Sequence, residues 1–123
     1  MGPLNIDPLI FEKFPGLTVG VITVKNLDNK GEDPEIQEFL RGAEKNSRET
    51  LSLDTLITNP KIEVWRNAYT AFGAKPKDHR SSIENLSRMV LNGVELRHIN
   101  KLVDLYNYIS LKHLLPVGGE DLD

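Results

Sequence analysis

Apolar residues recur at three- and four-residue steps in four stretches of the chain, residues 34–47, 60–72, 82–91 and 99–111. This spacing places the apolar side chains of each stretch on one side of a helix, so it predicts four amphipathic helices. Trp65 and Phe72, which fall on the apolar side of the second stretch, are expected to be core residues.

Three of these stretches have clear start signals. Asp33 and Asn59 each precede a proline, which combines a good N-cap residue with a residue suited to the first turn. Ser81 and Glu84 have the S-x-x-E spacing, in which each side chain accepts a hydrogen bond from the backbone N–H of the other. We therefore expect helices to begin at these positions.

One stretch has the composition of a strand. Residues 17–27, LTVGVITVKNL, are rich in β-branched side chains and carry apolar residues on both faces, which is typical of a covered strand. Together with the helical stretches, this predicts an α+β fold with a mixed sheet packed by three or four helices. The length of 123 residues and the hydrophobic content of 39% predict one domain over residues 1–123.

The last helical stretch carries polar residues in a column. Asn100, Asp104, Asn107 and Leu111 are spaced four, three and four residues apart, so they share one face. A different face carries the apolar stripe that is expected to be buried, formed by Ile99, Leu102, Val103, Tyr106 and Ile109. The residues alone leave three interpretations of the column open: a solvated face, a buried hydrogen-bond network or a site of chemistry.

Composition excludes several kinds of site. The chain has no cysteine, and its histidines, His79, His98 and His113, do not form a ligand-spaced cluster, so neither a metal nor another cofactor is expected. No apolar run reaches membrane-spanning length and no charged-then-apolar leader is present, which favours a soluble cytoplasmic protein without a membrane partner.

Charge is distributed unevenly along the chain. The net charge is −3, yet residues 61–113 hold nine Lys and Arg against five Asp and Glu. Lys75, Lys77 and Arg80 lie in the loop GAKPKDHR, directly before a helix N-terminus whose free N–H groups attract anions. These side chains are candidates for contacts with RNA phosphates, and Arg66 is a further one. The alternative is a solvated loop with ordinary surface charges.

The C-terminal part of the chain resembles a known family. The run NKLVDLYNYISL from Asn100, then PVGGED from Pro116, with Trp65-Arg66 and Phe72-Gly73 upstream, is similar to the B3/B4 tRNA-editing domain of the bacterial phenylalanyl-tRNA synthetase beta subunit. The agreement is greatest with free-standing relatives of that domain. It extends from about Ile62 to Asp123, and it implies that the chain corresponds to the N-terminal portion of the family domain.

The resemblance implies roles for individual residues. Asn107 matches the family asparagine that lines the pocket for the aminoacylated 3′ end of tRNA, and with Asp104 it would position substrate or water for ester hydrolysis. The residues expected to bind the substrate are Tyr106, Asn100, Gly118 and Gly119. Two of these depart from the family, since Tyr106 stands where threonine is usual and Gly118 where a histidine is found.

Three functions follow from these observations. The first is a tRNA-binding module that hydrolyses mischarged aminoacyl-tRNA in trans, with tRNA rather than DNA as its partner. The second, favoured by Gly118 in place of histidine, is a non-catalytic module that binds an RNA end or an amino acid. The third is a purely structural fragment. An exposed strand edge would also favour a homodimer or a complementary chain.

Overall fold

The computed structural model describes residues 4–121, which form two compact units. One unit contains residues 4–28 and 120–121, and the other contains residues 29–119. The larger unit holds all of the helices that the sequence predicts. The expectation of one domain over residues 1–123 stays a prediction.

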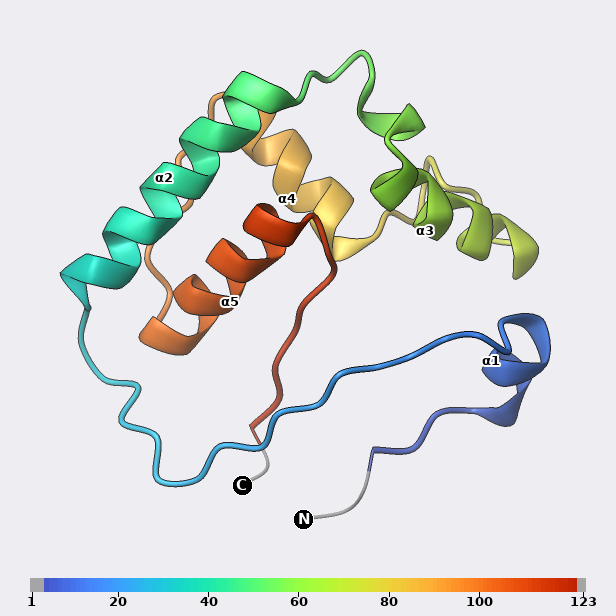
Figure 1. Ribbon diagram of the computed structural model, residues 1–123, viewed down its shortest axis with the longest axis horizontal. Helices are drawn as coiled ribbons and strands as arrows, with labels where there is room; N and C mark the ends of the chain where they lie inside the picture. Colours follow the sequence, from blue (N-terminus) through green and yellow to red (C-terminus); the bar gives the residue numbers. More distant parts are fainter. Residues whose placement is uncertain (1–3, 122–123) are drawn as a thin grey trace. The chain divides into compact units, whose positions relative to one another are not determined.

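The larger unit is built from helices. In chain order these are α2 (Pro34–Thr50), the short 3-10 helix η1 (Leu56–Thr58), α3 (Pro60–Ala71), α4 (Ser82–Leu91) and α5 (Lys101–His113). Helices α2, α4 and α5 pack against one another, and α3 packs against η1 (Figure 1). The buried hydrophobic core draws on all of them and consists of Leu40, Ala43, Leu56, Ile62, Ile83, Val90, Leu96, Leu111 and Leu114.

The helix starts lie where the sequence predicts them. The side chains of Asp33 and Asn59 accept hydrogen bonds from backbone N–H groups of the first turns of α2 and α3, at 2.9 and 3.0 Å. Ser81 Oγ accepts from the N–H of Glu84 at 3.3 Å. The reciprocal half of the expected capping box does not form, because the Glu84 carboxylate binds arginine side chains instead.

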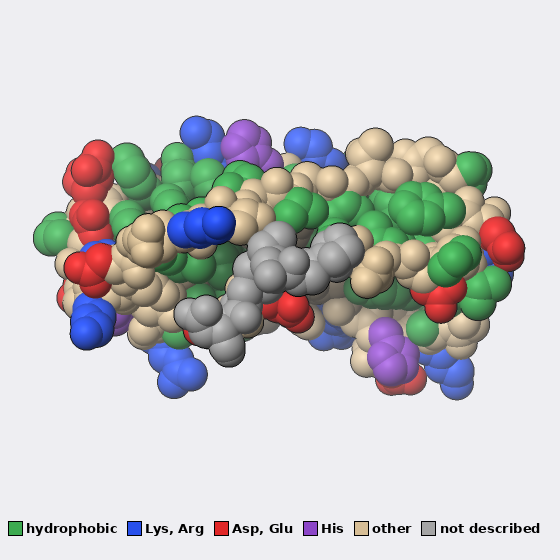
Figure 2. All heavy atoms as spheres, turned by 90° about the horizontal axis from the view of Figure 1, so that it is seen from below, with side chains coloured by type: hydrophobic (Ala, Val, Ile, Leu, Met, Phe, Trp, Pro, Cys, Tyr) green, Lys and Arg blue, Asp and Glu red, His purple; other side chains and the backbone are tan. Residues whose placement is uncertain are grey.

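The smaller unit contains one short helix, α1 (Pro8–Lys13), capped by Asp7, and an extended segment. This segment, residues 17–27, is not part of a sheet, and several of its apolar side chains are exposed; Ile22 is 90% exposed. Hydrophobic side chains are visible at the molecular surface in Figure 2.

The predicted α+β fold is wrong. Residues 4–121 contain helices and irregular segments, with no strand and no mixed sheet. A strand is stable when its backbone N–H and C=O groups pair with a neighbouring strand, and residues 17–27 have no such neighbour within the described chain. Their β-branched side chains are compatible with extended backbone, but they cannot replace a pairing partner.

The inward face of α5 also differs from the expected apolar stripe. Its buried residues are Asp104, Ser110 and Leu111, so two members of the column, Asp104 and Leu111, face the interior, while Asn100 and Asn107 are half-buried. Ile99, expected in the stripe, is 53% exposed and precedes the helix. Similarly, Phe72 is exposed and Trp65 half-buried, whereas Ile62 is the residue through which α3 joins the core.

Candidate functional site

Two of the three polar residues in the α5 column have side chains that hydrogen-bond to the protein, and the third does not. Asn100 is the N-cap, and its Oδ1 accepts a hydrogen bond from the Val103 N–H at 2.8 Å. Asp104, one turn further, is fully buried. Asn107 is half-buried, and its side-chain amide makes no hydrogen bond with any other described residue. Asn107 is therefore the polar member of the column whose side chain is not engaged by another described residue.

Asp104 lies at the centre of a hydrogen-bond network. Its Oδ2 accepts from Gln37 Nε2 of α2 at 2.6 Å and lies 2.5 Å from His98 Nδ1. Its Oδ1 accepts from the backbone N–H of Ile99 at 3.0 Å. Both carboxylate oxygens are therefore occupied by protein donors. This network joins α2, the segment before α5 and α5 itself, so the geometry gives Asp104 the role of holding the column in place.

Tyr106 and Gly119 lie against each other. A Cβ atom placed on Gly119 would come within 3.2 Å of Cε2 and 3.7 Å of Cδ2 of the Tyr106 ring. At Gly118 the same atom would meet nothing within 4 Å. The absence of a side chain at residue 119 thus allows the backbone to approach the tyrosine ring, while Gly118 is exposed.

The two arginines predicted to bind RNA meet at one carboxylate. Arg66 of α3 donates through Nη1 to both oxygens of Glu84, at 3.1 and 2.9 Å, and Arg80 Nε lies 3.4 Å from Glu84 Oε2. Arg88 joins them, with Nε 2.9 Å from the same oxygen. The sequence analysis missed Glu84 and Arg88 as members of a site. The four-residue spacing of Glu84 and Arg88 was the signal, because such residues lie on one helix face, whereas Arg80 precedes the N-cap of α4.

The two lysines of the candidate RNA-binding loop remain unpaired. Lys75 and Lys77 are exposed, and neither ammonium group makes an ion pair or hydrogen bond with a described residue. The loop backbone is ordered by a turn, in which the N–H groups of Asp78 and His79 donate to the carbonyl of Lys75, both at 2.9 Å. The lysine charges are therefore accessible to a polyanion.

A second buried carboxylate was also missed by the sequence analysis. Glu44 of α2 accepts from the backbone N–H of Leu96 at 2.7 Å and pairs with Arg41 Nε at 2.8 Å. Arg41 in turn contacts the carbonyl of Leu96 at 2.5 Å. This arrangement fixes the segment between α4 and α5 on α2. Arg41 Nε is buried and makes no hydrogen bond of good geometry, so its contact with Glu44 is an ion pair.

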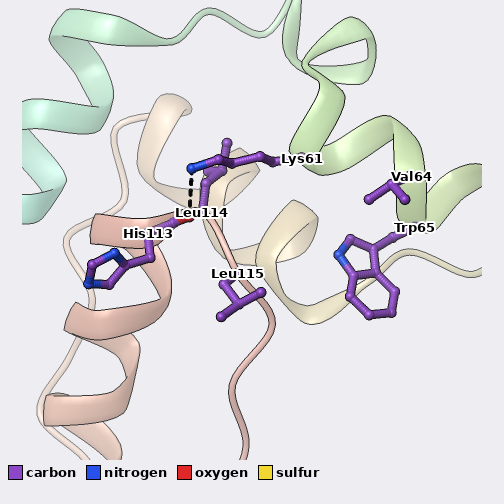
Figure 3. A pocket seen from close by; sticks show the side chains of 6 residues that line it. All are labelled: Lys61, Val64, Trp65, His113, Leu114 and Leu115. Carbon is purple, nitrogen blue, oxygen red and sulfur yellow. Dashed lines mark hydrogen bonds between the residues drawn. The ribbon is translucent and has the colours of Figure 1, made fainter. Parts of the chain in front are cut away.

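A surface pocket of about 310 Å³ lies between α3 and the end of α5. Its lining, shown in Figure 3, consists of Lys61, Val64, Trp65, His113, Leu114 and Leu115. Lys61 Nζ donates to the carbonyl of His113 at 3.3 Å across its rim (Figure 3). The mostly apolar lining suits a nonpolar group. None of the candidate residues identified in the sequence lines this pocket.

No group of three or more His, Asp or Glu side chains within residues 4–121 is arranged to hold a metal ion. None of the helices in that range combines the length and apolar character needed to cross a bilayer.

Comparison with known proteins supports the resemblance found in the sequence. Residues 64–123 match the model of a family described as the B3/4 domain. No curated protein and no solved structure matches the chain. The matched region begins in α3. It includes Glu84 with the three arginines that contact it, the loop that carries Lys75 and Lys77, and the polar column of α5.

Proposed function

We propose, from the premise that residues 64–123 are a B3/4 domain region of the kind found in phenylalanyl-tRNA synthetase beta-like proteins, that this chain binds the aminoacylated 3′ end of a tRNA. In this proposal the chain removes a wrongly attached amino acid by hydrolysis of the ester. The observation that carries the proposal is the unused side-chain amide of Asn107, because its neighbours in the column, Asn100 and Asp104, already have protein partners.

The chemistry assigned to Asn107 is positioning. An amide offers two donors and one acceptor. Its oxygen is able to orient an attacking water, or its NH₂ group to donate to the oxygen that becomes negative in the tetrahedral intermediate. Attack of water on the ester carbonyl then breaks the bond to the ribose oxygen, which takes up a proton. The products are the free amino acid and the tRNA with its 3′ hydroxyl restored.

The surrounding residues support this role in different ways. Gly119 lies against the Tyr106 ring, and a Cβ atom at Gly118 would meet nothing within 4 Å. Asp104 fixes the N-terminal turn of α5 through Gln37 and His98. Lys75 and Lys77 contribute attraction for phosphates, which does not depend on base sequence.

The second candidate function is binding without hydrolysis. It is favoured by Gly118, which stands where the resemblance implies a histidine and has no side chain to move a proton. A module of this kind would hold the RNA end or an amino acid without turning over the ester. Both candidates place the chain in the cytoplasm, where tRNA is aminoacylated.

A deacylation assay distinguishes the two candidates. Wild type, Asn107→Ala and the matched control Asn67→Ala would be incubated with a panel of tRNAs carrying different amino acids, while tRNA binding is measured separately. Asn67 is exposed on α3 and makes no hydrogen bond through its side chain in the described structure, so it controls for the loss of an amide. Turnover of one ester that Asn107→Ala loses and Asn67→Ala keeps supports the hydrolase. Binding without turnover supports the second candidate, and neither binding nor turnover rejects both.

We also expect a protein partner, either a second copy or a complementary chain. The exposed apolar side chains of residues 17–27 support this expectation, since exposed apolar patches are typical of interaction sites. Light scattering across a concentration series tests it, and a monomer at all concentrations contradicts self-association.

A further inference from the structure

Three guanidinium groups from different parts of the chain converge on one buried carboxylate. Arg66 comes from α3, Arg80 from the residues before α4, and Arg88 from α4 itself. Their contacts to Glu84 Oε2 measure 2.9, 3.4 and 2.9 Å, respectively. Glu84 is completely buried, so solvent does not compensate its charge. This arrangement is called the Glu84 cluster below.

The Glu84 cluster has an excess of positive charge. Three guanidinium groups face one carboxylate, which leaves two positive charges, and no other carboxylate of the described residues pairs with these arginines. Arginine stays charged at any physiological pH. Holding three like charges around one acceptor has an electrostatic cost that an additional anion would reduce.

The outer edges of these arginines remain available. The contacts to Glu84 use Nη1 of Arg66 and Nε of Arg80 and Arg88. Within residues 4–121 the other guanidinium nitrogens make no hydrogen bond. The three side chains are 23%, 37% and 24% exposed, respectively. Each of these side chains therefore contacts Glu84 and is also partly open to solvent.

We infer that the Glu84 cluster is a binding site for a phosphate group. Guanidinium groups present parallel N–H donors that match pairs of phosphate oxygens. The two surplus charges are close to the charge of a phosphate monoester and exceed the single negative charge of a phosphodiester. The buried carboxylate orients the three arginines before the ligand arrives, which lowers the entropic cost of binding. In RNA the ligand is a backbone phosphate, and inorganic phosphate has the same chemistry.

This inference goes beyond the proposed function, because phosphate binding requires neither Asn107 nor cleavage of an ester. It also differs from the contribution of Lys75 and Lys77. Those lysines are free surface charges, whereas the arginines of the Glu84 cluster are fixed in direction by a common buried partner.

The test follows the arginine side chains directly. The Nε–Hε resonances of the ¹⁵N-labelled chain would be recorded during titration with sodium phosphate, with sodium chloride added to keep the ionic strength constant. We expect saturable shifts for Arg66, Arg80 and Arg88 and none for Arg97, an exposed arginine that makes no ion pair in the described structure. A second titration with a single-stranded RNA ending in CCA identifies the source of the phosphate, since RNA bound at the same site displaces inorganic phosphate.

Matched variants make the test specific. Arg88→Gln should weaken phosphate binding by about tenfold, the effect of losing one charged hydrogen-bond partner, while Arg97→Gln removes the same charge and leaves binding unchanged. If Arg88→Gln does not fold, Arg80→Gln replaces it, because Arg80 is the most exposed member of the cluster and makes the longest contact.

The outcomes separate this inference from the proposed function. Equal shifts in phosphate and in chloride, or equal losses in the Arg88 and Arg97 variants, would overturn the phosphate site even if the chain deacylates tRNA. Saturable phosphate binding in a chain that cleaves no ester would retain the site and reject the hydrolase. If inorganic phosphate binds and RNA does not displace it, the site is confirmed and its ligand is a free phosphate compound.

Discussion

Gln37 and Asp104 are 67 residues apart in the chain, yet the amide nitrogen of one donates to the carboxylate of the other at 2.6 Å. This hydrogen bond joins the first turn of α2 to the first turn of α5. The same carboxylate oxygen lies 2.5 Å from His98 Nδ1. The residue that the sequence marks as a candidate for chemistry is thus also a junction between three segments of the fold.

Replacement of Asp104 by asparagine is expected to destabilise the chain. One carboxylate oxygen becomes an NH₂ group that faces donors instead of accepting from them, and a buried donor without a partner costs about 1–3 kcal/mol. We expect a loss of about 2 kcal/mol in the free energy of unfolding, measured by urea denaturation. Asp54→Asn, at an exposed position, is the control and should change it by less than about 0.5 kcal/mol.

The same variant tests whether Asp104 takes part in chemistry. If its role is to hold α5 in place, any deacylation activity should fall only in proportion to the folded fraction. A variant that stays fully folded and loses all activity would instead establish Asp104 as a catalytic residue.

Replacement of Glu84 by glutamine is expected to weaken the junction between α3 and α4. Arg66 loses an ionised acceptor, and three guanidinium groups remain close together without the carboxylate that compensates them. Because the arginines are partly exposed, water replaces some of the lost interaction, and we expect a loss of about 2 kcal/mol in unfolding free energy. Thermal or urea denaturation measures it. Glu63→Gln, on the exposed side of α3, should be close to neutral, and equal losses in the two variants would contradict the role of Glu84.

The parts of the fold that depend on neighbours in the sequence could be predicted. Asp33, Asn59 and Ser81 begin helices because capping involves residues two or three positions away. The predicted sheet was wrong, because a strand needs a pairing segment from elsewhere in the chain and the composition of residues 17–27 does not report whether one exists. β-branched composition reports only that an extended backbone is compatible with the side chains.

The candidate site likewise has features that the sequence could predict and features that depend on segments far apart in the chain. Periodicity placed Asn100, Asp104 and Asn107 on one face of a helix; in the structure Asp104 and Asn107 lie in α5, and Asn100 is its N-cap. It could not show that the face turns inward, because Asp104 is buried with the help of Gln37, which lies on another helix. In the same way, the four-residue spacing of Glu84 and Arg88 was visible in the sequence, whereas the approach of Arg66 from α3 depends on tertiary packing.

Substitution of alanine for the two adjacent glycines should have different effects. At Gly119 the new Cβ would lie 3.2 Å from the Tyr106 ring, so the ring must move by a few tenths of an ångström, whereas at Gly118 there is open space. We expect Gly119→Ala to change the chemical shifts of the Tyr106 ring protons and Gly118→Ala to leave them unchanged. If Tyr106 contributes to binding of the RNA end, Gly119→Ala should also weaken that binding. Equal spectra for the two variants would show that the contact between Tyr106 and Gly119 does not persist in solution.

The exposed lysines before α4 predict the salt dependence of RNA binding. For single-stranded RNA, log Kobs falls with log salt concentration by about 0.7 for each phosphate that the protein neutralises. If Lys75 and Lys77 each neutralise one phosphate, the Lys75→Gln, Lys77→Gln double variant should have a slope smaller in magnitude by about 1.4. Fluorescence anisotropy with a labelled oligonucleotide at several salt concentrations measures this slope.

The control for this experiment removes the same charge elsewhere. Lys25 and Lys45 are exposed, outside the region that matches the B3/4 domain, and their double replacement by glutamine also changes the net charge by two. If RNA binds at the loop before α4, this control should retain the full slope, because the phosphates contacted are unchanged. Equal reductions in both double variants would mean that RNA responds only to net charge, and the loop would then have no specific role in binding. A reduction confined to the Lys75 and Lys77 variant would locate the RNA next to Arg80 and the Glu84 cluster.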